Sequence, residues 1–261
     1  MRRTKIICTM GPATDNEDVL RDLMLNGMDV ARLNFSHGSH EEALERINRI
    51  KKVRDELNIP VAILLDTKGP EVRIKDFKEG KVELKEGQKF TLCTDDVVGD
   101  ENQVSITYAN LPNDVKVGSK ILIDDGLIEM EVISVKNSKI LCKVKNGGVV
   151  SNKKGVNVPN VALSMPYMSQ KDIDDILFGI EQDVDFIAAS FVRTADDIRE
   201  IKTLLRDNGG RDIRIIAKIE NAEGVDNIDD IIRETHGIMV ARGDMGVEID
   251  MHDLPVLQKS L

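Results

Sequence analysis

The stretch IAKIENAEGV, residues 216–225, begins like a buried strand and then carries two charged side chains. Lys218 and Glu220 stand two positions apart, and side chains two apart in a strand project from the same face. Burying a cation and a carboxylate costs free energy unless the two groups are paired, bound to an ion or used in chemistry. The spacing alone leaves three interpretations open, namely a structural Lys–Glu pair, a metal site and a catalytic centre.

Asp244 supplies a second carboxylate within another apolar stretch, GIMVARGDMG at residues 237–246. We expect Glu220 and Asp244 to converge from the ends of adjacent strands. Two carboxylates without a nearby histidine or cysteine suit Mg²⁺, which keeps positions for substrate oxygens and water. Lys218 would then be a fixed positive charge beside the metal, suited to stabilising the negative charge that develops in a phosphoryl transfer or an enolate.

Polar and apolar side chains alternate in ARLNFSH, residues 31–37. In a strand, Arg32, Asn34 and Ser36 share one face, while Leu33 and Phe35 share the other. A polar face toward a barrel interior and an apolar face toward helices would explain this division. An ordinary half-exposed strand is the alternative.

A third apolar stretch, AILLDTKGPEVR at residues 62–73, continues into Asp66, Thr67 and Lys68, with Arg73 just beyond. Charged groups at the carboxyl end of a parallel strand are typical of α/β active sites. A plain turn at the strand end explains the same residues equally well.

The remaining candidate residues have simpler explanations. His37 and His40 flank a turn and are expected at the surface or in a helix cap, and His236 beside Gly237 is expected to be structural. The basic turn SNKKGVN, residues 151–157, is either a solvated loop or a phosphate contact. The sequence contains no Walker, GxGxxG or GxSxG motif, so a bound nucleotide would be held without a P-loop.

Strands and helices alternate on both sides of a middle segment. Helical patterns follow apolar strands in the first 70 residues and again after Pro166, which is typical of a parallel sheet with helical crossovers. Six strands are predicted, and they end near Cys8, Phe35, Asp66, Phe191, Ile219 and Ala241. A closed (β/α)₈ barrel has eight strands, so the pattern fits either an open sheet or a barrel cut off after six strands.

The middle segment, from about Glu71 to Asn160, consists of short alternating strands separated by turns such as EG, DDG, KN and NGG. No helical period occurs there. We expect a small antiparallel β domain, a barrel by its strand pattern, inserted after the third strand of the host.

The composition argues against several classes of protein. A net charge of −10 argues against a general nucleic-acid or membrane-surface binder, since either needs a basic face. Three scattered cysteines without CxxC spacing indicate reduced thiols rather than a disulfide framework or a zinc site. No stretch reaches the ~18 apolar residues of a membrane span, and the apolar run near the N-terminus is too short for a signal peptide. We therefore expect a cytoplasmic protein.

Seven segments together resemble the pyruvate kinase family, in order and with matching spacing: KIICTMGPAT, MDVARLNFSHG, LLDTKGPEVR, KKGVNVPNV, KIENAEGVDN, GIMVARGDMGVEI and LPVLQK. The resemblance extends from residue 1 to residue 261. It implies a (β/α)₈ TIM-type barrel, truncated after about six strands and built from residues 1–70 and 162–261, with residues 71–161 as an inserted β-barrel lid. It also implies phosphoryl transfer from phosphoenolpyruvate to ADP, giving pyruvate and ATP in glycolysis, with Mg²⁺ and K⁺ as cofactors.

The same resemblance assigns roles to individual residues. Lys218 corresponds to the lysine that stabilises the transition state, and Glu220 and Asp244 correspond to the Mg²⁺ ligands. The implied substrate contacts are Arg32, Lys218, Gly243 and Asp244, of which Arg32 and Lys218 are also catalytic. The implied K⁺ ligands are Asn34, Ser36, Asp66 and Thr67, and the implied nucleotide contacts are Asn34, His37, Arg73 and Lys154.

Segments that would match the family's seventh and eighth strands and its C-terminal domain do not occur within these 261 residues. We therefore expect little turnover from the 261 residues alone, and a homotetramer for the complete family protein. Two alternatives remain. One is a catalytically inactive fragment or remnant of a pyruvate kinase, and the other is a different Mg²⁺-dependent barrel enzyme that forms an enolate.

Overall fold

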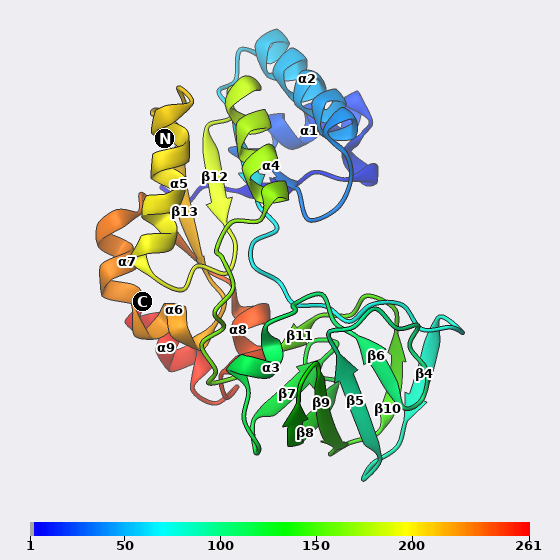
Figure 1. Cartoon of the computed structure of the whole chain (residues 1–261). Coiled ribbons are helices and arrows are strands. Elements are labelled where there is room, and N and C mark those ends of the chain that lie inside the picture. Colours follow the sequence, from blue (N-terminus) through cyan, green and yellow to red (C-terminus); the bar gives the residue numbers. More distant parts are fainter. Residues whose placement is uncertain (1–2) are drawn as a thin grey trace. The chain divides into compact units, whose positions relative to one another are not determined.

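The computed structural model describes residues 3–261 and is coloured along the sequence in Figure 1. Within these residues six strands form one sheet in the order β1-β2-β3-β12-β13-β14. Met1 and Arg2, which begin the predicted segment 1–70, lie outside the described residues. The strands are β1 (Ile7–Thr9), β2 (Val30–Asn34), β3 (Ala62–Asp66), β12 (Phe186–Ala189), β13 (Arg214–Ile219) and β14 (Gly237–Val240). Neighbouring strands from β1 to β13 pair in parallel. The predicted strand ends are confirmed to within one or two residues.

Helices follow these strands along the chain, as the apolar periodicity predicts. They are α1 (Glu17–Leu25), α2 (His40–Leu57), α4 (Gln170–Glu181), α5 (Ala195–Asp207), α6 (Ala222–Asp226), α7 (Ile228–Glu234), α8 (Arg242–Glu248) and α9 (Leu254–Ser260), with a 3₁₀ turn at Pro12–Thr14. Ser169 caps α4, because Asp172 N–H donates to Ser169 Oγ at 3.2 Å and Ser169 N–H donates to Asp172 Oδ2 at 3.0 Å. No helix in the described part of the chain is long and apolar enough to cross a membrane.

The central strands of this sheet are apolar on both faces. Ile63, Leu64 and Leu65 of β3 are fully buried, as are Ile187 and Ala188 of β12. Strands that are covered on both faces leave no room for charge along their length. Charge in the central strands therefore lies near their ends, as at Asp66 of β3, whereas Arg32 stands in the middle of β2.

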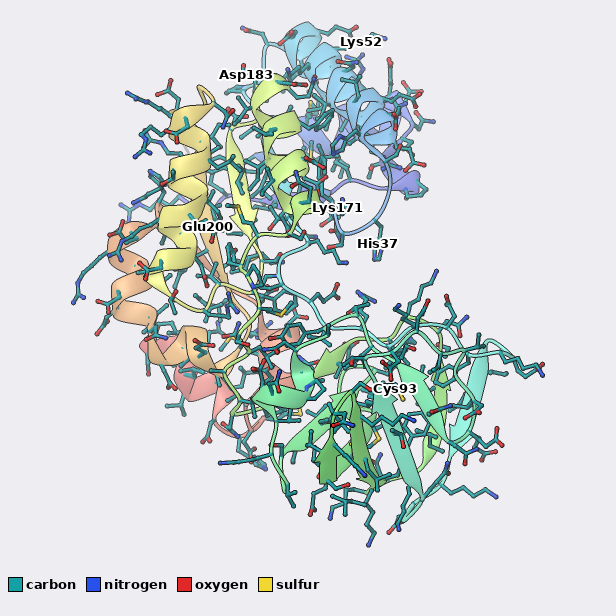
Figure 2. The ribbon with its side chains drawn as sticks, in the orientation of Figure 1. His37, Lys52, Cys93, Lys171, Asp183 and Glu200 are labelled. Atoms are coloured by element: carbon teal, nitrogen blue, oxygen red, sulfur yellow. The ribbon has the colours of Figure 1, made fainter. Side chains whose placement is uncertain are left out.

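The middle segment forms an all-β domain. Its elements are β4 (Lys81–Leu84), β5 (Lys89–Cys93), β6 (Gln103–Ser105), α3 (Leu111–Asp114), β7 (Lys120–Ile123), β8 (Ile128–Lys136), β9 (Lys139–Val144), β10 (Gly148–Ser151) and β11 (Val156–Asn157). They form a sheet in the order β11-β7-β8-β9-β5-β6 and a β10-β4 pair. Cys93, labelled in Figure 2, lies at the end of β5 and is fully buried.

Two details of this domain differ from the sequence expectation. The domain is not wholly antiparallel, because β5 and β6 pair in parallel. The loop between these strands returns the chain to the start of β5, so β6 runs in the same direction. The short helix α3 was also not expected, and it buries Leu111 and Pro112 in its first turn.

The structure divides into two compact units. The first contains the residues up to Gly69 together with Tyr167–Ile219 and Asn227–Met239, and the second contains Pro70–Pro166, Glu220–Asp226 and Val240–Leu261. We predicted one domain from residues 1–70 and 162–261 and another from residues 71–161. That division depends on the strand and helix patterns of the sequence rather than on spatial contacts. Those boundaries therefore stay a prediction.

Candidate active site

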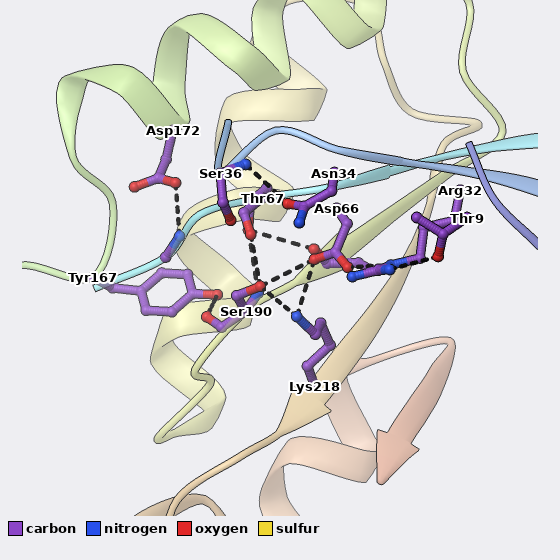
Figure 3. A network of polar contacts seen from close by, with 12 residues as sticks. Thr9, Arg32, Asn34, Ser36, Asp66, Thr67, Tyr167, Asp172, Ser190 and Lys218 are labelled. Atoms are coloured by element: carbon purple, nitrogen blue, oxygen red, sulfur yellow. Dashed lines mark hydrogen bonds and ion pairs between the residues drawn. The ribbon is translucent and has the colours of Figure 1, made fainter. Parts of the chain in front are cut away.

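Asp66 is the centre of a buried ion network at the carboxyl end of the parallel sheet (Figure 3). Its Oδ1 accepts a hydrogen bond from Lys218 Nζ at 3.0 Å, and its Oδ2 accepts one from Arg32 Nε at 2.5 Å. Asp66 is 1% exposed and Lys218 is 9% exposed. Because two cations share one carboxylate, these three side chains together carry a net positive charge, which suits an anionic substrate.

The strand order brings these distant residues together. β2 and β3 are neighbours, with Asn34 opposite Asp66 in their register, and β12 lies between β3 and β13. Arg32 also reaches the edge strand β1, because its Nη1 donates to Thr9 Oγ1 at 2.7 Å. The network therefore draws on β1, β2, β3 and β13, as expected for a site at the carboxyl ends of barrel strands.

Ser190 belongs to the same network, although our sequence analysis assigned it no role. Its Oγ lies 2.8 Å from Lys218 Nζ, 3.1 Å from Asp66 Oδ1 and 2.6 Å from the carbonyl oxygen of Thr67. Ser190 follows β12 just as Thr67 follows β3. A small polar residue directly after a parallel strand is the signal that would have identified it.

The four residues predicted to hold K⁺ lie together at the ends of β2 and β3. Asn34 Oδ1 accepts the Ser36 N–H at 2.9 Å, and Thr67 Oγ1 accepts the Ser190 N–H at 3.1 Å. Asp66 completes this all-oxygen set, whose carboxylate, amide and hydroxyl groups suit a hard cation. Asn34 Oδ1, Thr67 Oγ1 and Asp66 Oδ2 each have a lone pair beyond the hydrogen bond that they accept, so the residues present fit K⁺.

His37 lies in the loop between β2 and α2, next to the end of β2 (Figure 2). Together with Asn34, Glu42 and Arg46, it lines a cavity of about 30 Å³. A cavity of this size holds about one or two water molecules, not a nucleotide. The structure thus brings Asn34 and His37 to one surface, and a nucleotide would contact them from outside the cavity.

The two predicted Mg²⁺ ligands both lie in the second unit. Glu220 directly follows β13 and is 2% exposed, whereas Asp244 is exposed. Our expectation that Asp244 stands at a strand end is wrong, because β14 ends before it and Arg242–Glu248 forms α8. Asp244 and Gly243 lie in the first turn of this helix, where the helix dipole favours a carboxylate.

Glu248 at the end of α8 fixes this helix against the segment that follows Glu220. Its Oε2 accepts the Ala222 N–H at 3.3 Å, and its Oε1 accepts a hydrogen bond from Asn157 Nδ2 at 3.2 Å. Burial raises the pKa of Glu248, and these two hydrogen bonds act in the opposite direction. The backbones that carry the two predicted Mg²⁺ ligands are therefore tied together through Glu248.

Glu220 and Asp244 offer two carboxylates to a metal ion, and Mg²⁺ prefers oxygen ligands. Within residues 3–261, no three His, Cys, Asp or Glu side chains gather closely enough to hold a metal ion. A cation at Glu220 and Asp244 would therefore need further ligands from substrate and water. Mg²⁺ is commonly bound in this way, through one or two carboxylates, so the two residues fit Mg²⁺.

The structure brings the predicted nucleotide contacts Arg73 and Lys154 close together in the β domain. Arg73 forms a β-bridge with Gly155, the neighbour of Lys154. Both cations are ion-paired, Arg73 with Glu71 and Lys154 with Asp124 at 2.9 Å. A phosphate group bound here would share each cation with a carboxylate.

Two histidines have structural roles. His40 Nε2 lies 2.7 Å from Oδ1 of the buried Asp175, and the His40 ring stacks on Phe178 with 4.4 Å between ring centroids. His40 therefore joins α2 to α4, a role that the expected surface or cap position did not include. The structural role predicted for His236 is confirmed, because its Nδ1 accepts the Ile215 N–H at 3.0 Å.

Comparison with known families and structures gives one consistent match. A family model described as the barrel domain of pyruvate kinase matches residues 1–261. The crystal structure of a pyruvate kinase from Cryptosporidium parvum is similar with a TM-score of 0.94 and 40% sequence identity, covering 99% of this chain and 54% of that chain. These matches confirm the predicted fold class, a portion of a TIM-type barrel with an inserted all-β domain.

Curated proteins give the same match at higher identity. The pyruvate kinase of Clostridium perfringens (strain 13 / Type A) is 50% identical over 262 residues, and that of Geobacillus stearothermophilus is 53% identical over 262 residues. The two alignments cover 100% of this chain, but 55% and 45% of the respective relatives. The chain thus spans about half the length of the curated relatives it matches.

Proposed function

The chain belongs to the pyruvate kinase family, and we propose that it transfers the phosphoryl group of phosphoenolpyruvate to ADP, giving pyruvate and ATP in glycolysis. The observation that carries this proposal is the buried network in which Asp66 holds both Lys218 and Arg32. Such a centre would bind an anionic substrate and stabilise the negative charge that develops during phosphoryl transfer.

Lys218 supplies the stabilising charge in this proposal. Its ammonium is held at the carboxyl end of β13 by Asp66 before any substrate arrives, so little reorganisation is needed during the reaction. Arg32 presents a planar guanidinium, which suits a carboxylate or phosphate group of the substrate. Asp66 keeps the two cations apart by binding one on each oxygen.

Two cations complete the proposed centre. Glu220 and Asp244 would hold Mg²⁺, which when bound neutralises charge on the phosphoryl oxygens. Asn34, Ser36, Asp66 and Thr67 would hold K⁺, and Gly243 and Asp244 would contact the substrate. Asn34, His37, Arg73 and Lys154 would contact the nucleotide.

The cellular setting follows from the same proposal. Cys8, Cys93 and Cys142 are free thiols, which supports a reducing compartment such as the cytoplasm. Phosphoenolpyruvate, ADP and ATP are the proposed partners, and the homotetramer of the complete family protein is the proposed assembly.

The test is to measure ATP and pyruvate separately, using the full natural protein with phosphoenolpyruvate, ADP, Mg²⁺ and K⁺. Equal amounts of both products, with no reaction when ADP or Mg²⁺ is omitted, are expected. Pyruvate formed without ATP would instead indicate another enzyme that acts through an enolate. Binding of both ligands without any product would indicate a non-catalytic protein.

A further inference from the structure

We propose that Ser190 is a positioning residue that fixes the ammonium of Lys218 for phosphoryl transfer. The inference rests on the proposed function and deepens it, because it names the group that sets where the stabilising charge stands. Ser190 is 2% exposed and lies between the residues that follow β3 and those that end β13 (Figure 3).

The strand register places Ser190 beside Lys218. In the β12–β13 pairing, Ala189 is opposite Ala217, so the next residue along each strand brings Ser190 alongside Lys218. On the other side of β12, Ala188 is opposite Asp66 in β3. Ser190, which directly follows the intervening strand β12, can therefore reach both members of the Asp66–Lys218 pair.

The direction of the hydrogen bonds follows from the number of protons. The Lys218 ammonium can only donate, so the Ser190 hydroxyl accepts from it at 2.8 Å. The single hydroxyl proton is then available to Thr67 O at 2.6 Å or to Asp66 Oδ1 at 3.1 Å. A lone pair of Ser190 is thus aimed at the ammonium, which is held between two acceptors, Ser190 Oγ and Asp66 Oδ1.

The backbone of Ser190 is itself held from several directions. Its N–H donates to Thr67 Oγ1 at 3.1 Å, and its carbonyl oxygen accepts the Tyr167 hydroxyl at 3.0 Å. Phe191, the next residue, has a φ of +53°, which turns the chain sharply after Ser190. Gly69 packs so closely that a Cβ there would lie 2.7 Å from the Ser190 carbonyl oxygen. The hydroxyl is therefore presented from a fixed point rather than from a mobile loop.

The position of the Lys218 ammonium has to be fixed by its neighbours, because a lysine side chain is flexible. Without the serine hydroxyl, the ammonium loses an acceptor that fixes it and would move relative to Asp66. A displacement of about 1 Å in a catalytic group can cost ~10²-fold in rate. Loss of the hydroxyl should lower kcat rather than Mg²⁺ affinity, because Ser190 does not hold the segments that carry the two proposed Mg²⁺ ligands. Glu248 ties those segments together.

The test compares three variants of the full natural protein. Ser190→Ala removes the hydroxyl, and Ser190→Thr keeps it. Ser105→Ala is the matched control, because Ser105 is a fully buried serine of the β domain whose Oγ accepts the Val97 N–H at 2.7 Å and lies 2.7 Å from Asp95 O. Each variant is assayed for kcat, for KM of phosphoenolpyruvate and for Mg²⁺ activation, and its crystal structure is determined.

Ser190→Ala should lower kcat about 10- to 100-fold, while KM and the Mg²⁺ activation constant change by less than about threefold. Its crystal structure should show Lys218 Nζ displaced or in more than one position. Ser190→Thr should recover much of the lost rate, and Ser105→Ala should keep a normal kcat even if its melting temperature falls.

The inference is overturned if Ser190→Ala keeps kcat within about twofold of the unmodified protein, or if Ser105→Ala loses the same rate. It is also overturned if Lys218 Nζ keeps its place in the Ser190→Ala crystal structure, whatever happens to the rate. If the unmodified protein makes no ATP, the proposed function fails, and the position of Lys218 Nζ still decides whether Ser190 fixes the ammonium.

Discussion

Lys218 Nζ lies 3.0 Å from Asp66 Oδ1, although the two residues are 152 positions apart in the chain. β3 carries Asp66 and β13 carries Lys218, and β12 lies between them, so the pair reaches across one strand at the carboxyl end of the sheet. Removing two charges from water costs much of what their attraction returns, so a buried pair is weak evidence for a stabilising role. A role in chemistry explains its presence better.

Asp66→Asn should destabilise the protein strongly, because it leaves the buried Lys218 without its carboxylate. Breaking a buried ion pair from one side typically costs ~3–5 kcal/mol. The free energy of unfolding, measured by urea titration, should fall by about this amount. Asp96→Asn is the control, since Asp96 pairs with Lys75 but its side chain is 86% exposed, and it should have little effect. Equal losses in the two variants would contradict the interpretation of Asp66 as the buried centre.

Glu220→Gln should weaken Mg²⁺ activation before it affects the rate at saturating metal. It removes the charge of one of only two proposed protein ligands, and Mg²⁺ prefers charged oxygen ligands. The activity should therefore be measured as a function of Mg²⁺ concentration in the full natural protein. Glu131→Gln, which removes an exposed carboxylate of β8 paired with Lys145, is the control. An unchanged Mg²⁺ dependence in Glu220→Gln would exclude Glu220 as a metal ligand.

Cys8 should be the thiol that reacts in the folded protein, because it is half-buried while Cys93 and Cys142 are buried. Burial raises the pKa of Cys93 and raises the pKa of Cys142 to about 12. The reactive species is the thiolate, and at pH 8 a thiol with that pKa is ionised in about one molecule in 10⁴. Iodoacetamide labelling followed by peptide mass analysis should find Cys8 modified first, with Cys142 modified only after unfolding. Rapid labelling of Cys142 in the folded protein would show that the core of the β domain opens readily.

The inserted segment, residues 71–161, should fold when it is produced alone. Its buried core runs from Val72 to Val158 and includes Phe90, Ile121 and Met130, so the core itself comes from within the segment. Leu163 and Met165, just beyond the segment, pack against this core. Dispersed amide signals in an NMR spectrum and a cooperative thermal transition are expected. A spectrum with only random-coil amide shifts would contradict this prediction.

Part of this structure could be predicted from the sequence. Apolar periodicity located the six strands, and polar residues at their carboxyl ends, such as Asp66 and Lys218, marked where chemistry is concentrated. The pairing of these two residues could not be predicted, because it depends on which strands are neighbours in the sheet. Ser190 was missed since a serine after a strand is common and only its contacts distinguish it. Asp244 was placed at a strand end because the glycine-containing ARGDMG sequence does not show where a strand gives way to a helix.

The most direct test of the account is the kcat of Lys218→Met in the full natural protein at saturating Mg²⁺. The variant removes the ammonium that Asp66 and Ser190 hold, and it leaves Glu220 and Asp244 unchanged. Loss of one preorganised charge at the point of transfer typically costs ~10²–10³ in rate. We predict a fall in kcat of this size with Mg²⁺ activation largely retained. A kcat close to that of the unmodified protein would contradict the assignment of Lys218 as the group that stabilises phosphoryl transfer.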